Sequence, residues 1–379
     1  MALALALEQR QLKETAEQFF RDKAPVRALR RLRDERDAHG FSHDLWREMA
    51  ALGWAGIVIP EEYGGADFGY LGLGLILEAS GRTLAATPLL STALLGVSAL
   101  LLAGTPAQRQ ELLPAIAEGR LLTALALEEG PRHAPYGIAT RATATPDGFR
   151  LDGEKTFVLD GHVADYLIVV ARTAGTPGEA AGLTLFLVPG EVAGLTRTRT
   201  FMVDSRNAAR LTFSGVAVPR DAILGPVGGG GAILEQILDR GRSGLAAEML
   251  GSATEAFERT IAYLKERQQF GVAIGSFQAL KHRAAEMFAE LELARSVVLD
   301  ALSAIDAQRN DVPQAASLAK ARAGETFDLV SSEGIQMHGG IGMTDEHEIG
   351  FYLKRARVAQ QTFGDAAFHR DRYAALEGF

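Results

Sequence analysis

The middle of the sequence differs from both ends in the spacing of its apolar residues, and this difference limits the fold more than any other feature. Up to residue 118 or so, apolar residues recur at three- and four-residue spacing, and this spacing returns after the glycine run at 228–231. Between these zones, short runs rich in Thr, Val, Phe and Leu alternate with turn residues, including PDG at 146–148 and DG at 152–153. The first pattern is typical of amphipathic helices and the second of strands joined by hairpin turns.

This order predicts a chain that is mainly α with a central β domain. We predict an N-terminal helical domain over 1–118, a middle antiparallel, barrel-like β domain over 119–225 and a C-terminal helical bundle over 226–379. A chain of 379 residues suits two or three packed units of this kind. The periodic stretches 245–269, 278–306 and from about 313 to the paired glycines at 339–340 are long enough for bundle helices.

Composition excludes several classes of function. The formal charge is −8, so no overall basic excess favours nucleic acid or an anionic membrane. The chain has no cysteine, which excludes disulfides, thiolate zinc sites and iron–sulfur clusters, so any redox chemistry needs a bound cofactor. The most apolar stretch, 89–103, falls short of the roughly 20 residues of a membrane span, and the N-terminus does not resemble a secretory signal. We therefore expect a cytoplasmic protein without a membrane partner.

Five groups of short motifs occur in a fixed order along the chain. They are LGW at 52–54 with IPEEYGG at 59–65, VAVP at 216–219 with ILG at 223–225, ERQQFG at 266–271, FQ at 277–278, and QMHGGIG at 336–342. Together with the order of helices and strands, they resemble acyl-CoA dehydrogenases over most of the chain.

The resemblance implies a helical domain, a β-barrel-like domain and a C-terminal four-helix bundle. It also implies FAD as cofactor and an acyl-CoA thioester as substrate, which loses its α-proton to a carboxylate and its β-hydrogen to the flavin. Electrons then pass to an electron-transfer flavoprotein. Members assemble as homodimers or tetramers, or as α2β2 heterotetramers.

The motifs that contact the adenine side of FAD in the family match well. The resemblance assigns Arg267, Gln269, Phe270 and Gln278 to a segment that reaches the FAD of a neighbouring subunit, and Gln336, Gly339 and Gly340 to a second contact. An arginine fork suits a diphosphate, and glycine permits close approach of a backbone. The alternative interpretation treats these segments as a solvated helix end and a helix C-cap.

The motifs that hold the flavin ring are altered. Leu127 stands where the family has a threonine. Phe157 keeps an aromatic ring that packs behind the flavin, which we call the aromatic plate. Leu159 replaces a threonine whose hydroxyl lies near the reactive nitrogen of the flavin. Asp365 likewise replaces a threonine in the last motif. We count Leu127, Phe157, Leu159 and Asp365 among the expected FAD contacts.

The position of the usual catalytic glutamate holds Phe363, which cannot accept a proton. A minority of relatives place the base at a position matching Gly241, which also has no carboxylate. Glu248, Asp365 and Glu128 are possible substitutes, and Glu248 comes first because its apolar neighbours would raise the pKa of a buried carboxylate. His338 has no ligand partner at helical spacing on its N-terminal side, so we predict no metal site.

Two hypotheses follow. The first is an accessory subunit of a heteromeric α2β2 acyl-CoA dehydrogenase of the kind found in bacterial steroid side-chain degradation, which lends adenine and pyrophosphate contacts to a catalytic partner. The second is a self-sufficient, homo-oligomeric flavoenzyme of fatty acid or related catabolism that uses a base such as Glu248, or that performs related flavin chemistry with a weaker need for a base. A helical scaffold without cofactor is a third interpretation, and it leaves the segment from Arg267 to Gln278 unexplained.

Overall fold

The computed structural model describes residues 5–379; residues 1–4 of the predicted N-terminal domain lie outside the described part. The described chain divides into two compact units that interleave along the sequence. One unit contains the chain up to Arg31, Tyr70–Ala85 and Arg242–Phe379, and the other contains Leu32–Gly69 and Ala86–Gly241. Helices of the N-terminal part therefore contribute to both units.

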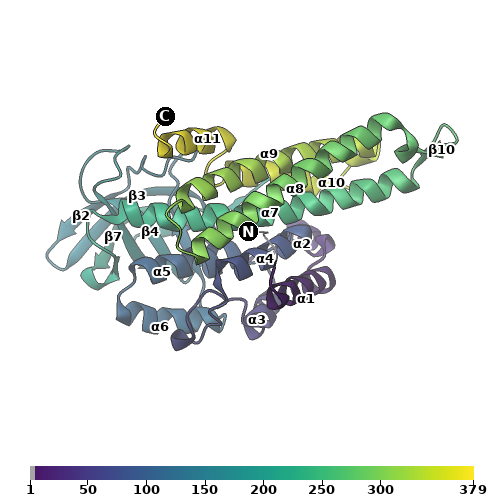
Figure 1. Ribbon diagram of the computed structural model, residues 1–379. Helices are drawn as coiled ribbons and strands as arrows, with labels where there is room; N and C mark the ends of the chain where they lie inside the picture. Colours follow the sequence, from purple (N-terminus) through teal and green to yellow (C-terminus); the bar gives the residue numbers. More distant parts are fainter. Residues whose placement is uncertain (1–4) are drawn as a thin grey trace. The chain divides into compact units, whose positions relative to one another are not determined.

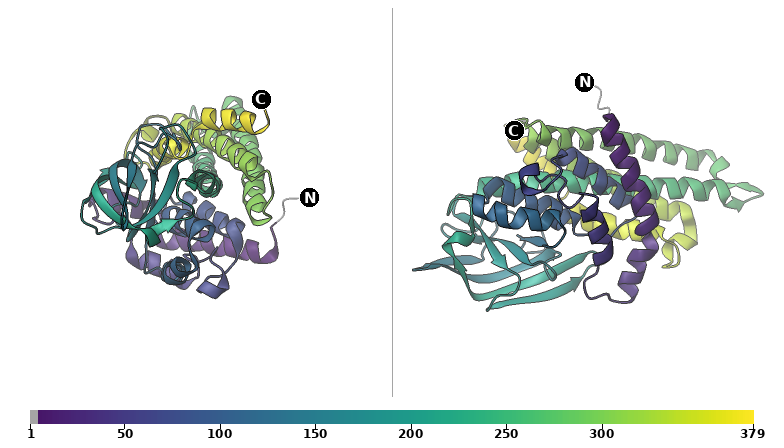
Figure 2. Two further views of the ribbon diagram at one scale, coloured as in Figure 1. Left: turned by 90° about the vertical axis from the view of Figure 1, so that its left-hand side faces the viewer. Right: turned by 90° about the horizontal axis from the view of Figure 1, so that it is seen from below.

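The first unit is helical and is built around the predicted bundle. Its helices are α1 (Leu7–Lys23), α4 (Gly69–Arg82), most of α7 (Gly230–Glu266), α8 (Gln278–Asp306), α9 (Val312–His338), α10 (Ile349–Gln361) and α11 (Ala366–Leu376). Helices α7, α8 and α9 run alongside one another, and the tip between α7 and α8 projects at one end (Figures 1 and 2). Helix α8 begins at the residue that the sequence predicts, and α9 ends before Gly339, whose φ of 64° suits a glycine that ends a helix.

Buried charge ties three helices of this unit together. The carboxylate of Glu78 on α4 accepts from the ammonium of Lys13 on α1 at 2.8 Å and from the guanidinium of Arg295 on α8 at 3.0 Å. The carboxylate of Asp306, at the end of α8, accepts from the backbone N–H groups of Tyr70 and Leu71 at the start of α4. Such a cap satisfies backbone donors that a helix start leaves unpaired.

The second unit combines short helices with one sheet. Its helical segments are the end of α2 (Val26–Asp34), α3 (His43–Ala51), a π-helix at Leu89–Gly96, α5 (Val97–Ala103) and α6 (Pro106–Ala117). Its strands are β1 (Thr123–Ala126), β2 (Arg141–Thr145), β3 (Gly148–Leu159), β4 (Tyr166–Arg172), β5 (Leu183–Pro189), β6 (Leu195–Phe201), β7 (Asn207–Pro219) and β8 (Ile223–Leu224).

The sheet is mainly antiparallel, in the order β6-β7-β3-β2-β4-β5-β8, and β1 pairs in parallel with β4. The hairpin predicted at 146–148 is confirmed, because Thr145 pairs with Gly148 between β2 and β3. The turn predicted at 152–153 is wrong. Both residues lie inside β3, directly after a shift in the register of its pairing with β7. Apolar side chains from β1 to β7 form a common core on one face of this sheet.

Within residues 5–379, no helix is both long and apolar enough to cross a lipid bilayer. The same residues contain no cluster of three or more His, Cys, Asp or Glu side chains arranged to hold a metal ion.

Candidate functional site

A β-bulge in β3 presents the aromatic plate that the resemblance predicts. Lys155 pairs with Leu211 of β7 and Val158 pairs with Ala209, so β3 carries one residue more than its partner strand between these points. The backbone of Phe157 adopts a φ of 52°, and its side chain is 40% exposed. Bulges of this kind turn a side chain out of the regular pleat and are frequent beside active sites. The bulge thus explains how Phe157 projects between the buried side chains of Lys155 and Val158.

Two hydrogen bonds bring the loop after β1 against this bulge. The backbone N–H of Thr156 donates to the carbonyl of Glu128 at 2.7 Å, and the ammonium of Lys155 donates to the carbonyl of Leu127 at 3.1 Å. Leu127 itself is buried. The structure therefore brings Leu127 and Phe157 together, with Leu159 two residues further along β3.

The sequence analysis missed an ion pair next to the bulge, between buried Lys155 and half-buried Glu129. The carboxylate of Glu129 accepts from the ammonium of Lys155 at 2.7 Å and from the backbone N–H groups of Ala139 and Thr140. Burial lowers the pKa of Lys155 to about 8, against the raising effect of Glu129. Burial opposes ionisation of Glu129, but the charge and hydrogen bond of Lys155 outweigh it and lower the pKa of that carboxyl. The pair fixes the loop that faces the bulge.

The loop that carries Phe363 connects α10 to α11. Phe363 is 7% exposed and has a φ of 60°, in the left-handed region that a side chain rarely adopts. Its carbonyl accepts from the imidazole of His369 at 3.0 Å and makes a long contact of 3.5 Å with the guanidinium of Arg242. The ammonium of Lys320 donates to the carbonyl of Gly364 at 2.8 Å. Three buried basic side chains therefore hold the backbone of this loop.

Because Lys320 is buried, the stability of the folded chain is expected to depend on pH. Burial, and then the charge of Arg242, lower the pKa of Lys320 to about 7 from its ordinary value of 10.5, although Asp365 acts to raise it. Between these values the unfolded chain binds more protons than the folded chain, so stability rises as the pH increases.

Lys320→Met should therefore flatten the dependence of the unfolding free energy on pH between 7 and 10.5. The wild-type chain should gain up to about 1.4 kcal/mol per pH unit relative to the variant across this window. Urea unfolding of both chains at several pH values measures the difference. An identical slope in the two chains would contradict the assignment.

Each carboxylate considered as a substitute base is engaged in a local interaction. Glu248 is buried on α7 and its carboxylate accepts from the guanidinium of Arg355 at 3.1 Å. Asp365 accepts from the backbone N–H of Phe368 and caps α11. Glu128 lies 2.5 Å from the imidazole of His133. The salt bridge with Arg355 engages the Glu248 carboxylate, which opposes its use as a base. Gly241 has no side chain that can serve.

The segment predicted to reach a neighbouring FAD forms a small hairpin at the tip between α7 and α8. Gln269 lies in β9 (Gln268–Gln269), which pairs with β10 (Val272–Ala273), and Gln278 is the first residue of α8. Phe270 sits in the turn with a φ of 56°, and its side chain is 90% exposed. Arg267, which joins α7 to this hairpin, is exposed as well. A large aromatic group so open to water suits a surface that another molecule covers.

The second predicted contact lies at the same end of the bundle. The ring of His338, the last residue of α9, stacks on Tyr263 of α7 with 4.4 Å between centroids, and the Tyr263 hydroxyl donates to the His338 carbonyl at 3.3 Å. Tyr263 lies one helical turn before Arg267. Gly339 and Gly340 are exposed, and within residues 5–379 no group other than their chain neighbours and nearby helix backbone lies within 4 Å of where a Cβ would stand on either. Together with exposed Gln336, they form an open backbone surface beside the hairpin.

These observations allow a test of the cofactor that the resemblance implies. The adenine-side residues fit FAD: an exposed arginine and aromatic ring stand beside an open glycine surface that permits close approach. On the ring side, the bulged Phe157 offers a plate, while Leu159 brings no hydroxyl.

The sequence signals for the supporting residues are weak. Lys155 is a lysine within an otherwise apolar strand face, and Lys320 is a lysine within an alanine-rich helix. Such positions stand out only after the fold shows that they are buried.

Comparison with known proteins agrees with this geometry. Models of the N-terminal, middle and C-terminal domains of acyl-CoA dehydrogenase match residues 7–120, 125–216 and 228–376. The chain is 31% identical over 377 residues to the probable acyl-CoA dehydrogenase YngJ of Bacillus subtilis, covering 98% of each protein. It is also 31% identical to the cyclohex-1-ene-1-carbonyl-CoA dehydrogenase of Syntrophus aciditrophicus, covering 85% of this chain and 79% of the relative.

Solved structures give the same result. A variant of the Tcur3481-Tcur3483 steroid ACAD superposes with a TM-score of 0.87 at 34% identity, covering 98% of this chain and 97% of that one. The butyryl-CoA dehydrogenase of Megasphaera elsdenii superposes with a TM-score of 0.90 at 28% identity and covers 100% of both chains. On this similarity along its whole length, the chain belongs to the acyl-CoA dehydrogenase family of FAD-dependent oxidoreductases.

Proposed function

We propose that this chain is one subunit of a heteromeric, FAD-dependent acyl-CoA dehydrogenase in which a second kind of subunit supplies the catalytic base. The reaction is the α,β-desaturation of an acyl-CoA, for which bound FAD supplies the electron acceptor. The observation that carries the proposal is that the carboxylates of Glu248, Asp365 and Glu128 each interact with another group of this chain, while the resemblance assigns the usual base position to Phe363. This chain then contributes Arg267 and Phe270 to the cofactor of its partner.

The separation of two contacts along α9 supports exchange between subunits. Lys320 of α9 holds the loop of Phe363, whereas α9 ends beside the hairpin of Arg267. The 19 residues from Lys320 to Gly339 correspond to about 28 Å along the helix axis, at 1.5 Å per residue. Figure 1 shows α11 and the hairpin of β10 at opposite ends of the bundle. At this separation, we expect the loop of Phe363 and the hairpin of Arg267 to contact the FAD groups of two different subunits.

The relatives provide further support. The structure at 34% identity is described as a steroid ACAD with two protein names, Tcur3481 and Tcur3483. The subunit CarC of the caffeyl-CoA reductase-Etf complex of Acetobacterium woodii is 30% identical over 345 residues. These names favour a two-protein assembly, a bulky acyl group such as a steroid side chain, and an electron-transfer flavoprotein as acceptor.

One observation favours a second candidate function, a self-sufficient homo-oligomeric dehydrogenase. The bulge at Phe157 and the loop fixed by Glu129 are fully formed in this chain, as a flavin ring site of its own would require. In that case Glu248 would be the base.

Expression of the chain alone and together with any acyl-CoA dehydrogenase subunit encoded beside its gene distinguishes the two functions. We expect the chain alone to purify without flavin colour and the co-expressed complex to bind FAD that an acyl-CoA reduces. A yellow homo-oligomer whose flavin is bleached by an acyl-CoA would contradict the heteromer.

Glu248→Gln provides an independent test in the complex. The amide keeps the shape of the side chain and an oxygen that faces Arg355, so turnover should stay within about threefold of wild type if Glu248 is structural. The matched control is Glu258→Gln on the same helix, where the carboxylate is exposed and pairs with Arg82. A loss of about 100-fold or more in Glu248→Gln alone, measured by flavin reduction in a stopped-flow experiment, would identify Glu248 as the base.

A further inference from the structure

Three aromatic side chains pack together where α9 ends and α10 begins. The rings of His338 and His347 lie 4.5 Å apart between centroids, and Tyr263 of α7 stacks on His338. His338 is the last residue of α9, and His347 stands two residues before α10. We call residues 338–348 the histidine segment, and both its histidines and Tyr263 belong to the first unit.

Hydrogen bonds decide which nitrogen of each imidazole carries the proton. Nδ1 of His338 lies 2.6 Å from the carbonyl oxygen of Gly334, which can only accept, so this nitrogen is protonated. Nδ1 of His347 lies 3.2 Å from the backbone nitrogen of Ile349, which can only donate, so Nδ1 carries the lone pair. The proton of His347 is therefore on Nε2, and this ring is neutral in the folded segment.

Neither ring can take up a second proton without a loss of hydrogen bonding. Nε2 of His338 is buried, and it has no hydrogen-bond partner within residues 5–379, so a proton added there would be a buried donor without an acceptor. A proton added to Nδ1 of His347 would replace its hydrogen bond with Ile349 by two opposed donors. Burial is also the largest cause of a lowered pKa in both imidazoles.

Two charged side chains face the pair, Arg259 of α7 and Glu348 at the end of the histidine segment. Arg259 opposes protonation of His347, whereas Glu348 favours it. The carboxylate of Glu348 already accepts from the guanidinium of Arg259 at 2.7 Å, so its charge is offset. On the outer side of the segment, the carboxylate of Asp345 pairs with the guanidinium of Arg30 at 2.9 Å. The charges around the rings therefore do not stabilise an imidazolium.

We propose that the histidine segment opens when the pH falls, because His338 and His347 gain protons only after they leave this packing. In the open segment each imidazole recovers its ordinary pKa of 6.5. The open form then binds more protons than the closed form, so the closed form loses stability as the pH falls below this value. Each ring should favour opening by about tenfold between pH 7.5 and pH 5.5.

Opening of the histidine segment has a consequence for the cofactor. The glycines at 339–340 lie inside the segment, and the resemblance assigns them to the adenine side of FAD. The hold on FAD should therefore weaken when the segment opens. This consequence rests on the proposed function, whereas the opening itself does not.

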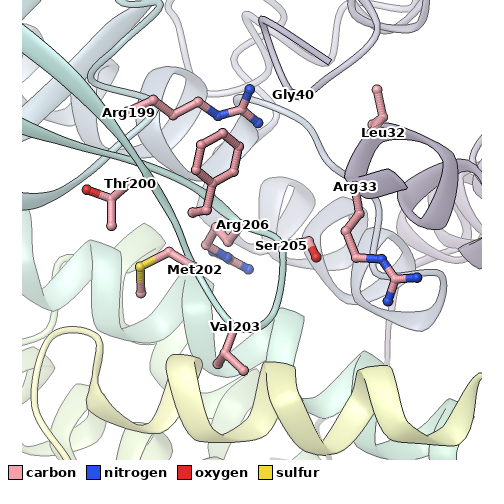
Figure 3. A pocket seen from close by; sticks show the side chains of 10 residues that line it. Leu32, Arg33, Gly40, Arg199, Thr200, Met202, Val203, Ser205 and Arg206 are labelled. Carbon is pink, nitrogen blue, oxygen red and sulfur yellow. The ribbon is translucent and has the colours of Figure 1, made fainter. Parts of the chain in front are cut away.

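The hollow between the end of α2 and the hairpin that joins β6 to β7 provides a contrast. Its charged side chains are arginines, which Figure 3 shows around the hairpin. Arg199 donates to the side chain of Asn207, and Arg33 contacts Asp34. Arginine stays protonated at all physiological pH values, so the positive charge at this hollow is permanent. At the histidine pair, positive charge depends on pH.

Hydrogen–deuterium exchange at about pH 7.5 and about pH 5.5, followed by mass spectrometry, measures the opening in the purified protein, as complex or single chain. Protection factors over residues 338–350, corrected for the intrinsic pH dependence of exchange, should fall by between about tenfold and 100-fold at the lower pH. Peptides over 291–305 of α8 report global unfolding, and their protection should fall less.

The double variant His338→Asn with His347→Asn should abolish this fall. An asparagine amide does not titrate, yet it can donate to the Gly334 carbonyl and accept from the Ile349 N–H as the imidazoles do. The matched control His282→Asn removes an exposed histidine of α8 in the same unit and should leave the fall unchanged. If circular dichroism shows that the double variant does not fold, His347→Asn alone decides, and it should reduce the fall.

The proposal is overturned if protection of the histidine segment is the same at both pH values, if it falls no more than that of α8, or if the asparagine variant loses protection as the wild type does. Flavin absorbance after gel filtration at both pH values tests the cofactor consequence separately. A constant FAD content alongside a loss of protection would refute the contact of the glycines at 339–340 with FAD, but not the opening.

Discussion

Arg267→Ala is expected to release FAD from the complex that contains this chain. A charge-assisted hydrogen bond contributes about 1.5 kcal/mol or more, so the loss of a two-pronged contact with the diphosphate should cost about 3 kcal/mol, or roughly 150-fold in affinity. The side chain is exposed beside the hairpin of Phe270, so its removal should not disturb the bundle. Flavin absorbance of the purified complex after gel filtration measures the FAD that remains.

Lys265→Ala is the matched control for this experiment. Lys265 is an exposed cation in the last turn of α7, two residues before Arg267, and the resemblance gives it no cofactor contact. Its removal changes the local charge by the same amount, so a general electrostatic effect would appear in both variants. An unchanged FAD content in Arg267→Ala would refute the assignment of the hairpin to the cofactor.

Arg355→Met should have the largest effect on stability of the substitutions considered. It removes the arginine that neutralises Glu248 inside the bundle and leaves a buried carboxylate without that partner. Breaking a buried ion pair from one side costs about 3–5 kcal/mol of unfolding free energy. Urea unfolding followed by circular dichroism measures the loss. The surface variant Arg47→Ala, which also breaks an ion pair, should cost less than about 1 kcal/mol.

The double variant Glu248→Leu with Arg355→Met separates the ion pair from the packing of its members. Apolar residues of similar size in place of a buried pair are often neutral or stabilising, so the double variant should recover most of the loss. A single variant that costs less than about 1 kcal/mol would mean that Glu248 does not depend on Arg355. Combined with the turnover of Glu248→Gln, the result decides whether this carboxylate braces the bundle or removes a proton.

The long helices were predictable because their periodicity extends over many turns. Helix α8 occupies Gln278–Asp306, as the sequence predicts, and α9 starts within a residue of the prediction and ends at the paired glycines. The turn predicted at 152–153 does not form. The pairing of the 12-residue strand β3 with β7 continues on both sides of a local register shift at this point. The parallel pairing of β1 with β4 joins segments about 40 residues apart, and no local pattern encodes such a contact.

The candidate site was predictable where short motifs carry its chemistry. The motifs predict cofactor contacts in the hairpin of Arg267 and Phe270 and at the glycines after His338, and they assign the base position to Phe363. They do not locate the groups that hold these segments, such as Lys155, because a buried lysine is recognised only from its surroundings in space. For the same reason, the engagement of Glu248 by Arg355 could not be inferred from residues more than 100 positions apart.

Because of the extra residue at the bulge, the buried positions of β3 change from odd-numbered to even-numbered residues. Before the bulge, buried side chains such as Leu151 and Lys155 fall on odd-numbered positions, whereas after it Val158 is buried at an even one. Deletion of a single residue at 156 or 157 would remove the bulge: Val158 would stay on the face of Lys155 in a regular strand, and no side chain would project as Phe157 does. The number of residues in β3 at the bulge is therefore constrained more strictly than the identity of those residues. A relative that lacks one residue here will have lost the plate, whichever amino acids remain around it.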